Sequence, residues 1–516
     1  KERTSPVHLS LLQQMAHLQQ RLKNPSAARN LLLTAYAYYD LARLNTLGED
    51  GRLWLDEEQK ELIDDIVRSF IRSNEIATAL AFLESNKAST LSEIIDDSAF
   101  RQAQTKWNEM QLRQTLELVK LLDGDTPHQL SSKEKVAVFI DGLVRRHREE
   151  AQELQSQLGL QSATAARSLS SEKLQEIQSE LPVNVAVLSF FVQRRQSSVF
   201  VITRAGIQHI PVNLTGCECM KAAQQLRVAL SNPVTDFYRE PAQYLYQSLL
   251  GSVLKNLPPS VNVIVYSPDG PLARVPLAAL MDGEHFVGER FAVYQVPSLR
   301  FLAKPLKHNQ KSELNGLACV DPQVGDARLP AQSETGDVLQ KLYGEKLVAL
   351  TRKGCTSKAL VGEIQKQKSP LFIHLGAQGF LYPPRKMDSG LLLSPEGESG
   401  QKASPWSAKE IAALDMSHVE LVTLSTTAPG LLEYKYQRDA IGIVRPFFFG
   451  GAKRVLAPLW HTADEPAGEF MKAFYRSYAK NIPAPLSLQQ AQLSLMRSEK
   501  YRHPHYWATY VLTEGL

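Results

Sequence analysis

Long apolar runs are missing from this sequence of 516 residues. Because a transmembrane helix needs about 20 consecutive apolar residues, we expect no membrane span. Cysteine is also scarce, and so few thiols do not form the disulfide framework of a small secreted protein. A reducing cytoplasm is therefore the expected location. The four cysteines are Cys217, Cys219, Cys319 and Cys355.

A large net charge is absent too, since 58 basic residues face 54 acidic ones and leave a formal charge of +4. This balance argues against nucleic acid as a direct partner. The sequence has no Gly-rich phosphate loop, no paired-carboxylate signature and no zinc motif, so we expect no cofactor and no metal. The chain begins at Lys1 without an initiator Met or a signal-peptide core, and we expect a fragment or a processed product.

Residues 1–180 are dominated by the pattern of amphipathic helices, with apolar residues three and four positions apart. Leu11, Leu18 and Leu22 keep this spacing. We predict helical hairpins of the kind found in TPR arrays, although a repeat of about 34 residues is too blurred to count. Two longer helices are predicted further on, at 99–122 and 131–159.

After Pro182 the hydrophobic period changes to the alternation of a β-strand. We predict three meandering strands at 185–213 and two helices near 216–231 and 239–256. Beyond a Lys-rich linker at 303–315, strands alternate with helices, a pattern that predicts a parallel sheet covered on both faces. The predicted strands are near 315–321, 346–350, 370–374, 419–425, 453–459 and 507–513. The predicted helices are near 331–343, 356–367, 407–414, 438–449, 465–479 and 487–499.

Two of these strands end in small, Gly-containing turns. The first is residues 371–379, LFIHLGAQG, and the second is residues 421–430, LVTLSTTAPG. Each begins as a short apolar run, as expected of a buried parallel strand. Open α/β sheets bind their ligands in the crevice beyond the carboxyl ends of the strands. The two turns therefore mark the expected site.

These strand ends and several other segments resemble the CHAT family, caspase- and separase-like cysteine peptidases that are often fused to TPR helices. The resemblance also rests on Pro-Asp-Gly-x-Leu-x-x-x-Pro at 268–276 and on DSGLLLS, FFFGGAKRVLAPLW and RHPHYWATYVL. It implies an α+α/β fold, with TPR-like helical hairpins followed by a caspase-like α/β CHAT domain with a mixed sheet. The implied divisions are a helical region at 1–180, a pseudo-caspase half at 181–305 and a caspase-like half at 306–516.

The catalytic pair of the resembled family is missing from the two strand ends. The family carries His-x-x-x-His-Gly at the first end and Ser-x-Cys-x-x-Gly at the second. His374 and Gly379 match the first sequence, but Gln378 stands where the catalytic His belongs. In the second sequence Thr427 stands where the nucleophilic Cys belongs. The residues that match the second sequence are Ser425 and Gly430.

Both replacements remove the chemistry of a cysteine peptidase. A thiol, with an ordinary pKa of about 8.5, is acidic enough for a neighbouring His to help ionise it. The hydroxyl of Thr427 is far harder to ionise. The amide of Gln378 donates and accepts hydrogen bonds but takes no proton near neutral pH. The crevice is therefore expected to lack both a nucleophile and a base.

Other residues offer weak substitutes for the missing pair. We expect His374 to pack or hydrogen-bond inside the protein, and Cys319 to be a small buried residue at a strand end. Cys355 precedes a helix, where a thiol pKa can fall, so it is a mildly reactive candidate, but no His is placed beside it. His461 could reach the crevice from the end of the next strand. Two tail histidines are interpreted as structural, not as metal ligands, and they are His503 and His505.

We therefore predict a catalytically inactive CHAT-type protein that acts by binding. The helical region is expected to recruit a protein partner, and the degenerate crevice to accept an extended peptide along the sheet. Two alternatives stay open. One is an active endopeptidase that uses an unrecognised nucleophile or is activated by a partner. The other is a purely structural subunit of a larger assembly. The sequence indicates no particular oligomeric state.

Overall fold

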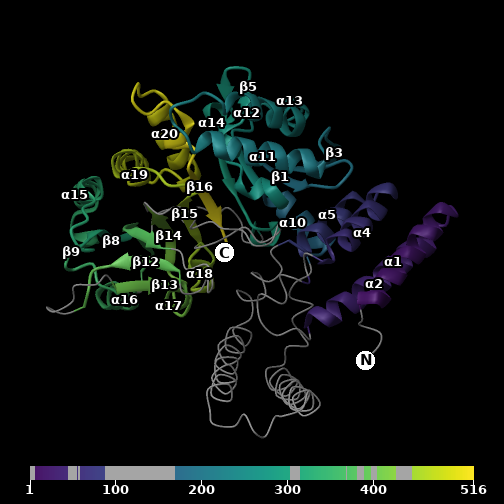
Figure 1. Ribbon diagram of the computed structural model, residues 1–516, viewed down its shortest axis with the longest axis horizontal. Helices are drawn as coiled ribbons and strands as arrows, with labels where there is room; N and C mark the ends of the chain where they lie inside the picture. Colours follow the sequence, from purple (N-terminus) through teal and green to yellow (C-terminus); the bar gives the residue numbers. More distant parts are fainter. Residues whose placement is uncertain are drawn as a thin grey trace, which may run out of the picture. The chain divides into compact units, whose positions relative to one another are not determined.

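The structure is a computed structural model, shown in Figure 1. It describes residues 6–44, 55, 58–87, 169–302, 314–367, 369–380, 389–396, 404–425 and 444–515. The chain divides into two compact units, Lys1–Leu169 and Ser170–Leu516. The helices predicted at 99–122 and 131–159 lie outside the described residues, as does most of the linker predicted at 303–315.

The described part of the first unit is helical, as predicted. Its main helices are α1 Pro6–Arg21, α2 Pro25–Leu44, α4 Lys60–Arg72 and α5 Ile76–Ser85. Proline begins both α1 and α2, a position where its missing N–H leaves no hydrogen bond unmade. α2 packs against α1 and α4, and α4 packs against α5.

Arg29 of α2 joins the later helices of this unit to the earlier ones. Its guanidinium donates to Glu75 Oε1 at 2.7 Å and to the Ser69 carbonyl at 3.1 Å. The same group lies 4.8 Å from the centre of the Phe70 ring. One side chain therefore fixes α2 against α4 and the turn that precedes α5.

The second unit is built on one large sheet, and the described strands in it follow the spatial order β3-β2-β1-β4-β7-β16-β15-β14-β10-β8-β9. A short helix, α10 Ser171–Glu180, leads into this unit. The strands of the first half are β1 Val185–Phe191, β2 Ser198–Thr203, β3 Gly206–Pro211, β4 Val263–Ser267 and β7 Ala292–Gln295. Those of the second half are β8 Asn315–Pro322, β9 Leu347–Arg352, β10 Leu371–Gly376, β14 Val419–Leu424, β15 Arg454–Pro458 and β16 Tyr510–Glu514.

The pairing of these strands confirms the predicted mixed sheet. β1, β2 and β3 form the predicted antiparallel meander, and β1 also pairs in parallel with β4. From β9 to β15 the strands are parallel, but β16 runs antiparallel to β15. Two long helices, α19 Asp464–Tyr478 and α20 Ala484–Met496, separate β15 from β16. The second of them brings the chain back to the end of the sheet where β15 stopped, which explains the reversed direction.

Helices cover both faces of the second half of the sheet, as the alternation of strands and helices predicted. α15 Pro330–Tyr343 packs on β8 and α19, while α18 Val444–Phe449 packs on β15 from the other side. Figure 1 shows α15 and α19 above the strands, and α16 and α17 on the other side with α18. The remaining helices are α11 Gly216–Leu230, α12 Arg239–Leu245, α13 Gly251–Lys255, α14 Val287–Arg290, α16 Ser357–Lys366, α17 Ala408–Ala412 and α21 Pro504–Trp507.

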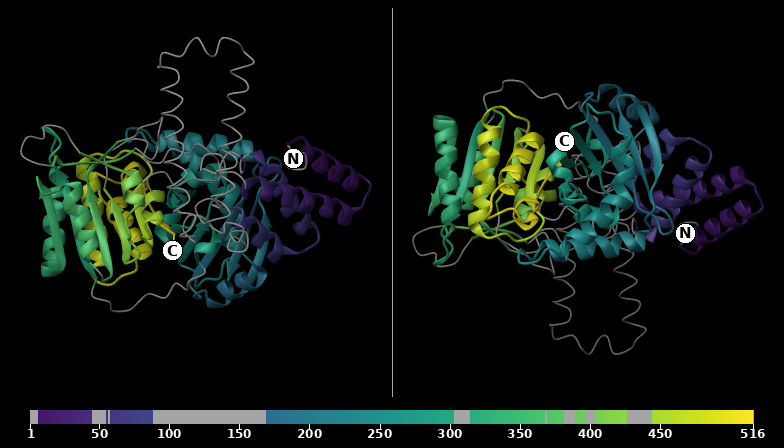
Figure 2. Two further views of the ribbon diagram at one scale, coloured as in Figure 1. Left: turned by 90° about the horizontal axis from the view of Figure 1, so that it is seen from below. Right: turned by 90° about the horizontal axis from the view of Figure 1, so that it is seen from above.

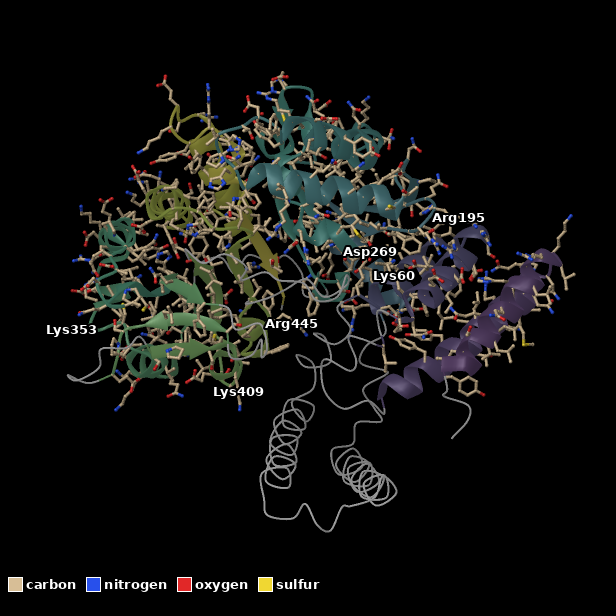
Figure 3. All side chains as sticks on the ribbon, viewed as in Figure 1. Lys60, Arg195, Asp269, Lys353, Lys409 and Arg445 are labelled. Atoms are coloured by element: carbon tan, nitrogen blue, oxygen red, sulfur yellow. The ribbon has the colours of Figure 1, made fainter. Side chains whose placement is uncertain are left out.

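Two predicted segments differ in detail from the structure. The single helix predicted near 239–256 is divided by a π-helical turn, Tyr246–Leu250, where the Tyr246 hydroxyl donates to Asp282 Oδ2 at 2.8 Å. The Pro-Asp-Gly motif at 268–270 leads into short 3-10 turns. There Asp269, labelled in Figure 3, accepts a 2.8 Å hydrogen bond from Val192 N. Gly270 has a φ of +56°, which glycine adopts easily, so the motif works as a tight turn.

The two halves of the sheet join where β7 meets β16, with Thr513 opposite Gln295. The amide of Gln295 reinforces this pair by donating to Thr513 Oγ1 at 2.8 Å. Gln489 of α20 adds a second tie by donating to the Gly288 carbonyl at 3.0 Å. Figure 2 shows the yellow C-terminal strand between the teal and green parts of this unit. The division of the unit at residue 305 stays a prediction.

We expect Gly468→Ala to destabilise the protein, because helices α15 and α19 are in backbone contact there. A Cβ atom on Gly468 would lie 2.8 Å from both the Cβ and the carbonyl oxygen of Ala331. Separating the helices should lower the free energy of unfolding by about 1–3 kcal/mol. Chemical denaturation measures the change.

Gly362→Ala is the matched control, since Gly362 also lies in a helix, α16, but a Cβ atom placed on it would have no other atom within 4 Å. Alanine favours a helix over glycine by about 1 kcal/mol, so this variant should gain stability. Equal effects of the two substitutions would contradict the close contact at Gly468.

Candidate functional site

The predicted site depends on two strand ends that the sheet places side by side. β10 and β14 are parallel neighbours, with His374 opposite Thr423 and Leu375 opposite Leu424. Ser425, the first residue beyond β14, donates its backbone N–H to the Leu375 carbonyl at 2.9 Å. The expectation that the two Gly-containing turns begin next to each other is therefore confirmed.

Gln378 lies just beyond the end of β10, at the start of the short strand β11 Gln378–Phe380. This strand belongs to a small antiparallel sheet with β12 Gly390–Leu393 and β13 Ser404–Ser407. Gln378 pairs with Leu392 and Gly379 with Leu391, and both residues are half-buried. An amide, rather than an imidazole, therefore occupies the outer side of this crevice.

Thr427 and Gly430 lie outside the described residues. Their side-chain geometry relative to Gln378 stays a prediction. What the structure shows is the origin of the segment that carries them. It leaves the sheet at Ser425, one strand away from the segment that carries Gln378.

His374 lies in the interior, as predicted, and does not reach the crevice. Its side chain is fully buried, and Nδ1 is 2.8 Å from Thr423 Oγ1. Thr423 in turn is 2.6 Å from the Tyr475 hydroxyl of α19, whose ring packs edge-on against the imidazole. Burial lowers the pKa of His374 to about 3, because the charged imidazolium would lose its hydration. His374 is therefore a neutral core residue and cannot serve as a displaced base.

The cysteines provide no replacement nucleophile near these strand ends. Cys319 is buried in β8, and a hydrogen bond with Cys355, together with burial, raises the pKa of its thiol. Cys355 is buried as well, with Sγ 3.0 Å from the Leu350 carbonyl, so the mild reactivity predicted from its place before α16 is wrong. Burial raises the pKa of Cys219 to about 12. Cys217 is exposed, but it lies in the first turn of α11, in the other half of the unit.

A group of buried hydroxyls, which the sequence analysis missed, gathers at the carboxyl ends of β14 and β15. Ser425 and Thr462 are fully buried, and their hydroxyls lie near that of Tyr510 on β16. Among the residues that the structure describes, none of the three oxygens has a hydrogen bond of standard geometry. Burial raises the pKa of Tyr510 to about 12, although the two neighbouring hydroxyls act in the opposite direction. The group is therefore neutral and can still donate and accept hydrogen bonds.

An amide and a carboxylate lie beside these hydroxyls. Gln332 Nε2 donates to Asp464 Oδ1 at 3.1 Å, and Ala331 N donates to Asp464 Oδ2 at 2.8 Å. The other amide atom, Gln332 Oε1, is buried without a hydrogen bond, and a Cβ on Gly376 would lie 2.8 Å from it. Burial is the main cause that raises the pKa of Asp464. Unpartnered buried polar atoms cost free energy, and an ordered water or a polar ligand group commonly satisfies them.

The remaining candidate histidines make no hydrogen bond with this polar group among the described residues. His461 follows β15 and is exposed, whereas His503 and His505 hold the C-terminal tail in place. His503 Nε2 donates to the Thr235 carbonyl at 3.0 Å, and His505 Nδ1 donates to the Leu230 carbonyl at 2.9 Å. The prediction of a structural tail is confirmed. No cluster of three or more His, Cys, Asp or Glu among the described residues is arranged to hold a metal.

Comparison with known proteins gives a family match over the second unit. A family model described as the CHAT domain matches residues 239–514. Tetratricopeptide repeat protein 28 of Homo sapiens is 23% identical over 327 residues, which are 54% of this chain and 13% of that protein. Its Mus musculus counterpart is 26% identical over 296 residues, covering 47% of this chain and 12% of that protein. This chain therefore spans about an eighth of the length of these relatives.

Among solved structures, the Saccharomyces cerevisiae separase–securin complex at 2.6 Å resolution superimposes with a TM-score of 0.52. The alignment covers 96% of this chain and 38% of that chain at 12% sequence identity, which supports a shared fold and nothing finer. Within the part of the chain that the structure describes, every helix is too short or too polar to cross a membrane.

We predict that His374 makes the protein less stable in acid. The unfolded chain takes up a proton on this residue below its ordinary pKa of about 6.5, whereas the folded chain does not until about pH 3. The contribution of His374 to the free energy of unfolding is thus present above pH 6.5 and is lost as the pH falls toward 3. Between pH 7 and pH 5 the loss should be about 2 kcal/mol, measured by urea unfolding.

The variant His374→Gln should therefore lose about 2 kcal/mol less between these two pH values than the wild type. His461→Gln is the control, because that side chain is exposed in the folded protein, and its pH dependence should match the wild type. An unchanged pH dependence in His374→Gln would contradict the buried neutral imidazole.

Proposed function

The chain belongs to the CHAT domain family, and from this premise we propose that it is a catalytically inactive member that works by binding other proteins. The observation that carries the proposal is Gln378, an amide at the strand end where the resembled peptidases have their catalytic His. The sequence adds Thr427 at the position of the nucleophile. We place this activity in the cytoplasm, because all four cysteines are free thiols.

The surroundings of Gln378 support inactivity more strongly than the two replacements alone. Peptidase chemistry needs a base that can take a proton, but His374 is held in the interior as a neutral imidazole. It also needs an ionisable nucleophile, but the cysteines of the caspase-like half are buried, and Cys217 lies on α11 of the other half. Among the described residues near these strand ends, we find no other side chain that could act as the base or as the nucleophile.

The same surroundings suit peptide binding. β11 is the outer strand of its small sheet and pairs only with β12 among the described strands, so one of its edges can accept an extended peptide by strand addition. Gln378 on that strand can donate and accept hydrogen bonds. A polar, uncharged peptide segment is the ligand that this chemistry favours.

Two other functions are kept as alternatives to the proposal. An active endopeptidase would need a nucleophile outside the described residues or activation by a partner. A structural subunit of a larger assembly would need neither a crevice nor an exposed strand edge. Only the first alternative predicts turnover, and only the proposal predicts that changes at the strand ends alter peptide binding.

We expect the purified protein to show no turnover of fluorogenic peptide libraries, and Thr427→Ala to leave that result unchanged. The physical reason is the lack of an ionisable nucleophile and of a base to activate it. Activity is measured with and without a peptide electrophile that would label a reactive thiol or hydroxyl. Turnover by the wild type that disappears in Thr427→Ala would end the proposal.

We also expect the double variant Gln378→His with Thr427→Cys to fold and to place the new imidazole near the new thiol. Both replacements are close in size to the residues that they replace, so packing should change little. β10 and β14 are neighbours, and both segments start from their carboxyl ends. A crystal structure of the variant measures the separation. Side chains more than about 8 Å apart would show that the two motifs do not correspond to the family pair.

A further inference from the structure

Helix α1 presents a stripe of large apolar side chains to solvent. The stripe consists of Leu11, Met15, Leu18 and Leu22, with exposed fractions of 52%, 45%, 55% and 65%. Leu22 continues the helix by one hydrogen bond, from its N–H to the Leu18 carbonyl at 3.0 Å. Lone exposed apolar residues are ordinary on protein surfaces, but a contiguous row of four is typical of an interaction site.

The opposite face of α1 is the one that packs within the unit, and it is the less apolar of the two. Among the described side chains of α1, Leu9 and Ala16 are the buried apolar ones, and the half-buried residues are Leu12, Gln13, Gln19 and Gln20. An amphipathic helix normally turns its larger apolar residues toward the core. From Leu9 to Leu22 α1 does the reverse, and none of the described helices covers its stronger apolar face.

The spacing of the stripe selects a helix as that element. The four residues follow one another at intervals of four, three and four, which keeps them in a narrow row along the helix axis. This is the spacing by which two helices pack side by side, each side chain entering a gap between residues of the partner. An extended strand, whose side chains alternate every second residue, would not match the row.

The charges beside the stripe indicate that the partner helix is acidic. From Pro6 to Lys23 the chain carries no Asp or Glu, and Arg21 and Lys23 are exposed beside the end of the stripe. Acidic residues flanking the apolar row of a partner would meet these two cations. A second copy of α1 would bring no carboxylate to them, which argues against self-association through this face.

We propose that the stripe on α1 is the docking surface for an acidic amphipathic helix of a protein partner, with apolar residues at alternating three- and four-residue intervals. This inference rests on the proposed function, because it names the class of partner that the helical region would recruit. It concerns the first unit alone and requires nothing of the crevice.

The test uses the full chain and a synthetic peptide of about three heptads, with Leu at both core positions and Glu at the flanking positions. Repulsion between its own glutamates keeps the peptide from pairing with itself. Fluorescence anisotropy gives its Kd for the protein. We expect Met15→Gln with Leu18→Gln to weaken binding by about tenfold or more. Glutamine keeps the helix, and circular dichroism verifies this.

The control removes two more exposed apolar residues elsewhere, by Val228→Gln with Phe237→Gln, where the exposed fractions are 66% and 77%. This control should bind the peptide like the wild type. A scrambled peptide of the same composition, and a peptide with Lys in place of Glu, should both bind more weakly. Failure of the Glu peptide to bind, equal binding of the scrambled peptide, or equal binding by the stripe variant would each overturn the inference.

Sedimentation velocity tests the other candidate occupant of the stripe, which is a second copy of the protein. Self-association of the wild type that the stripe variant abolishes would show that a second copy covers α1, and would also overturn the inference. The proposed function is tested independently of this inference. Peptidase turnover by the wild type would contradict the proposed function without changing the Kd of the acidic peptide. Loss of peptide binding in the stripe variant alongside an inactive crevice supports both.

Discussion

The parallel pairing of β10 with β14 is the constraint on which the candidate site depends. It brings together the ends of two strands that lie about fifty residues apart in the chain, with Leu375 opposite Leu424. The pairing is reinforced from inside by His374, which contacts Thr423 on the neighbouring strand. Thr423 extends the chain of hydrogen bonds to Tyr475 on α19. Sheet and covering helix are therefore fixed to each other directly beneath the crevice.

The described part of the candidate site is polar, with the amide of Gln378 and the buried hydroxyls of Ser425 and Thr462. Its amide and hydroxyl groups remain neutral near pH 7, so they can hold a peptide by hydrogen bonds without attacking it. Burial pushes the ionisable groups nearby toward their neutral forms, as the lowered pKa of His374 and the raised pKa of Tyr510 show. These neutral groups agree with the proposal that the site binds a peptide and does not cleave it.

The first unit also exposes groups that would be more stable in contact with a partner, because helix α1 presents apolar side chains to water. In stacked helical arrays each element buries its apolar face against a neighbour. α1 instead exposes Leu11, Met15, Leu18 and Leu22. We therefore propose one surface for a helix, on α1, and one for an extended peptide, at the edge of β11. Binding at either place needs no catalysis, which agrees with the replacements at the strand ends.

Much of the fold could be predicted because local patterns determine local structure. The strand around His374 and the helix around Gly468 follow from runs of apolar residues and their period, since burial of one face is a property of neighbouring residues. Their ends were predicted to within a few residues. The reversed direction of β16 did not follow, since no local pattern records which edge of a sheet a strand joins.

The sequence by itself determined which residues stand at the two strand ends, and therefore that a base and a thiol are missing there. Tertiary structure alone decided which residues surround them. The hydroxyls of Ser425, Thr462 and Tyr510 come from three separate strand ends, and only the sheet brings them together. Burial likewise made Cys355 inert, although its place before a helix predicted reactivity. The spacing of Leu11 and Leu18 predicted a helix. Which side of that helix faces solvent depends on its packing against α2, and the local spacing of apolar residues does not determine contacts with another helix.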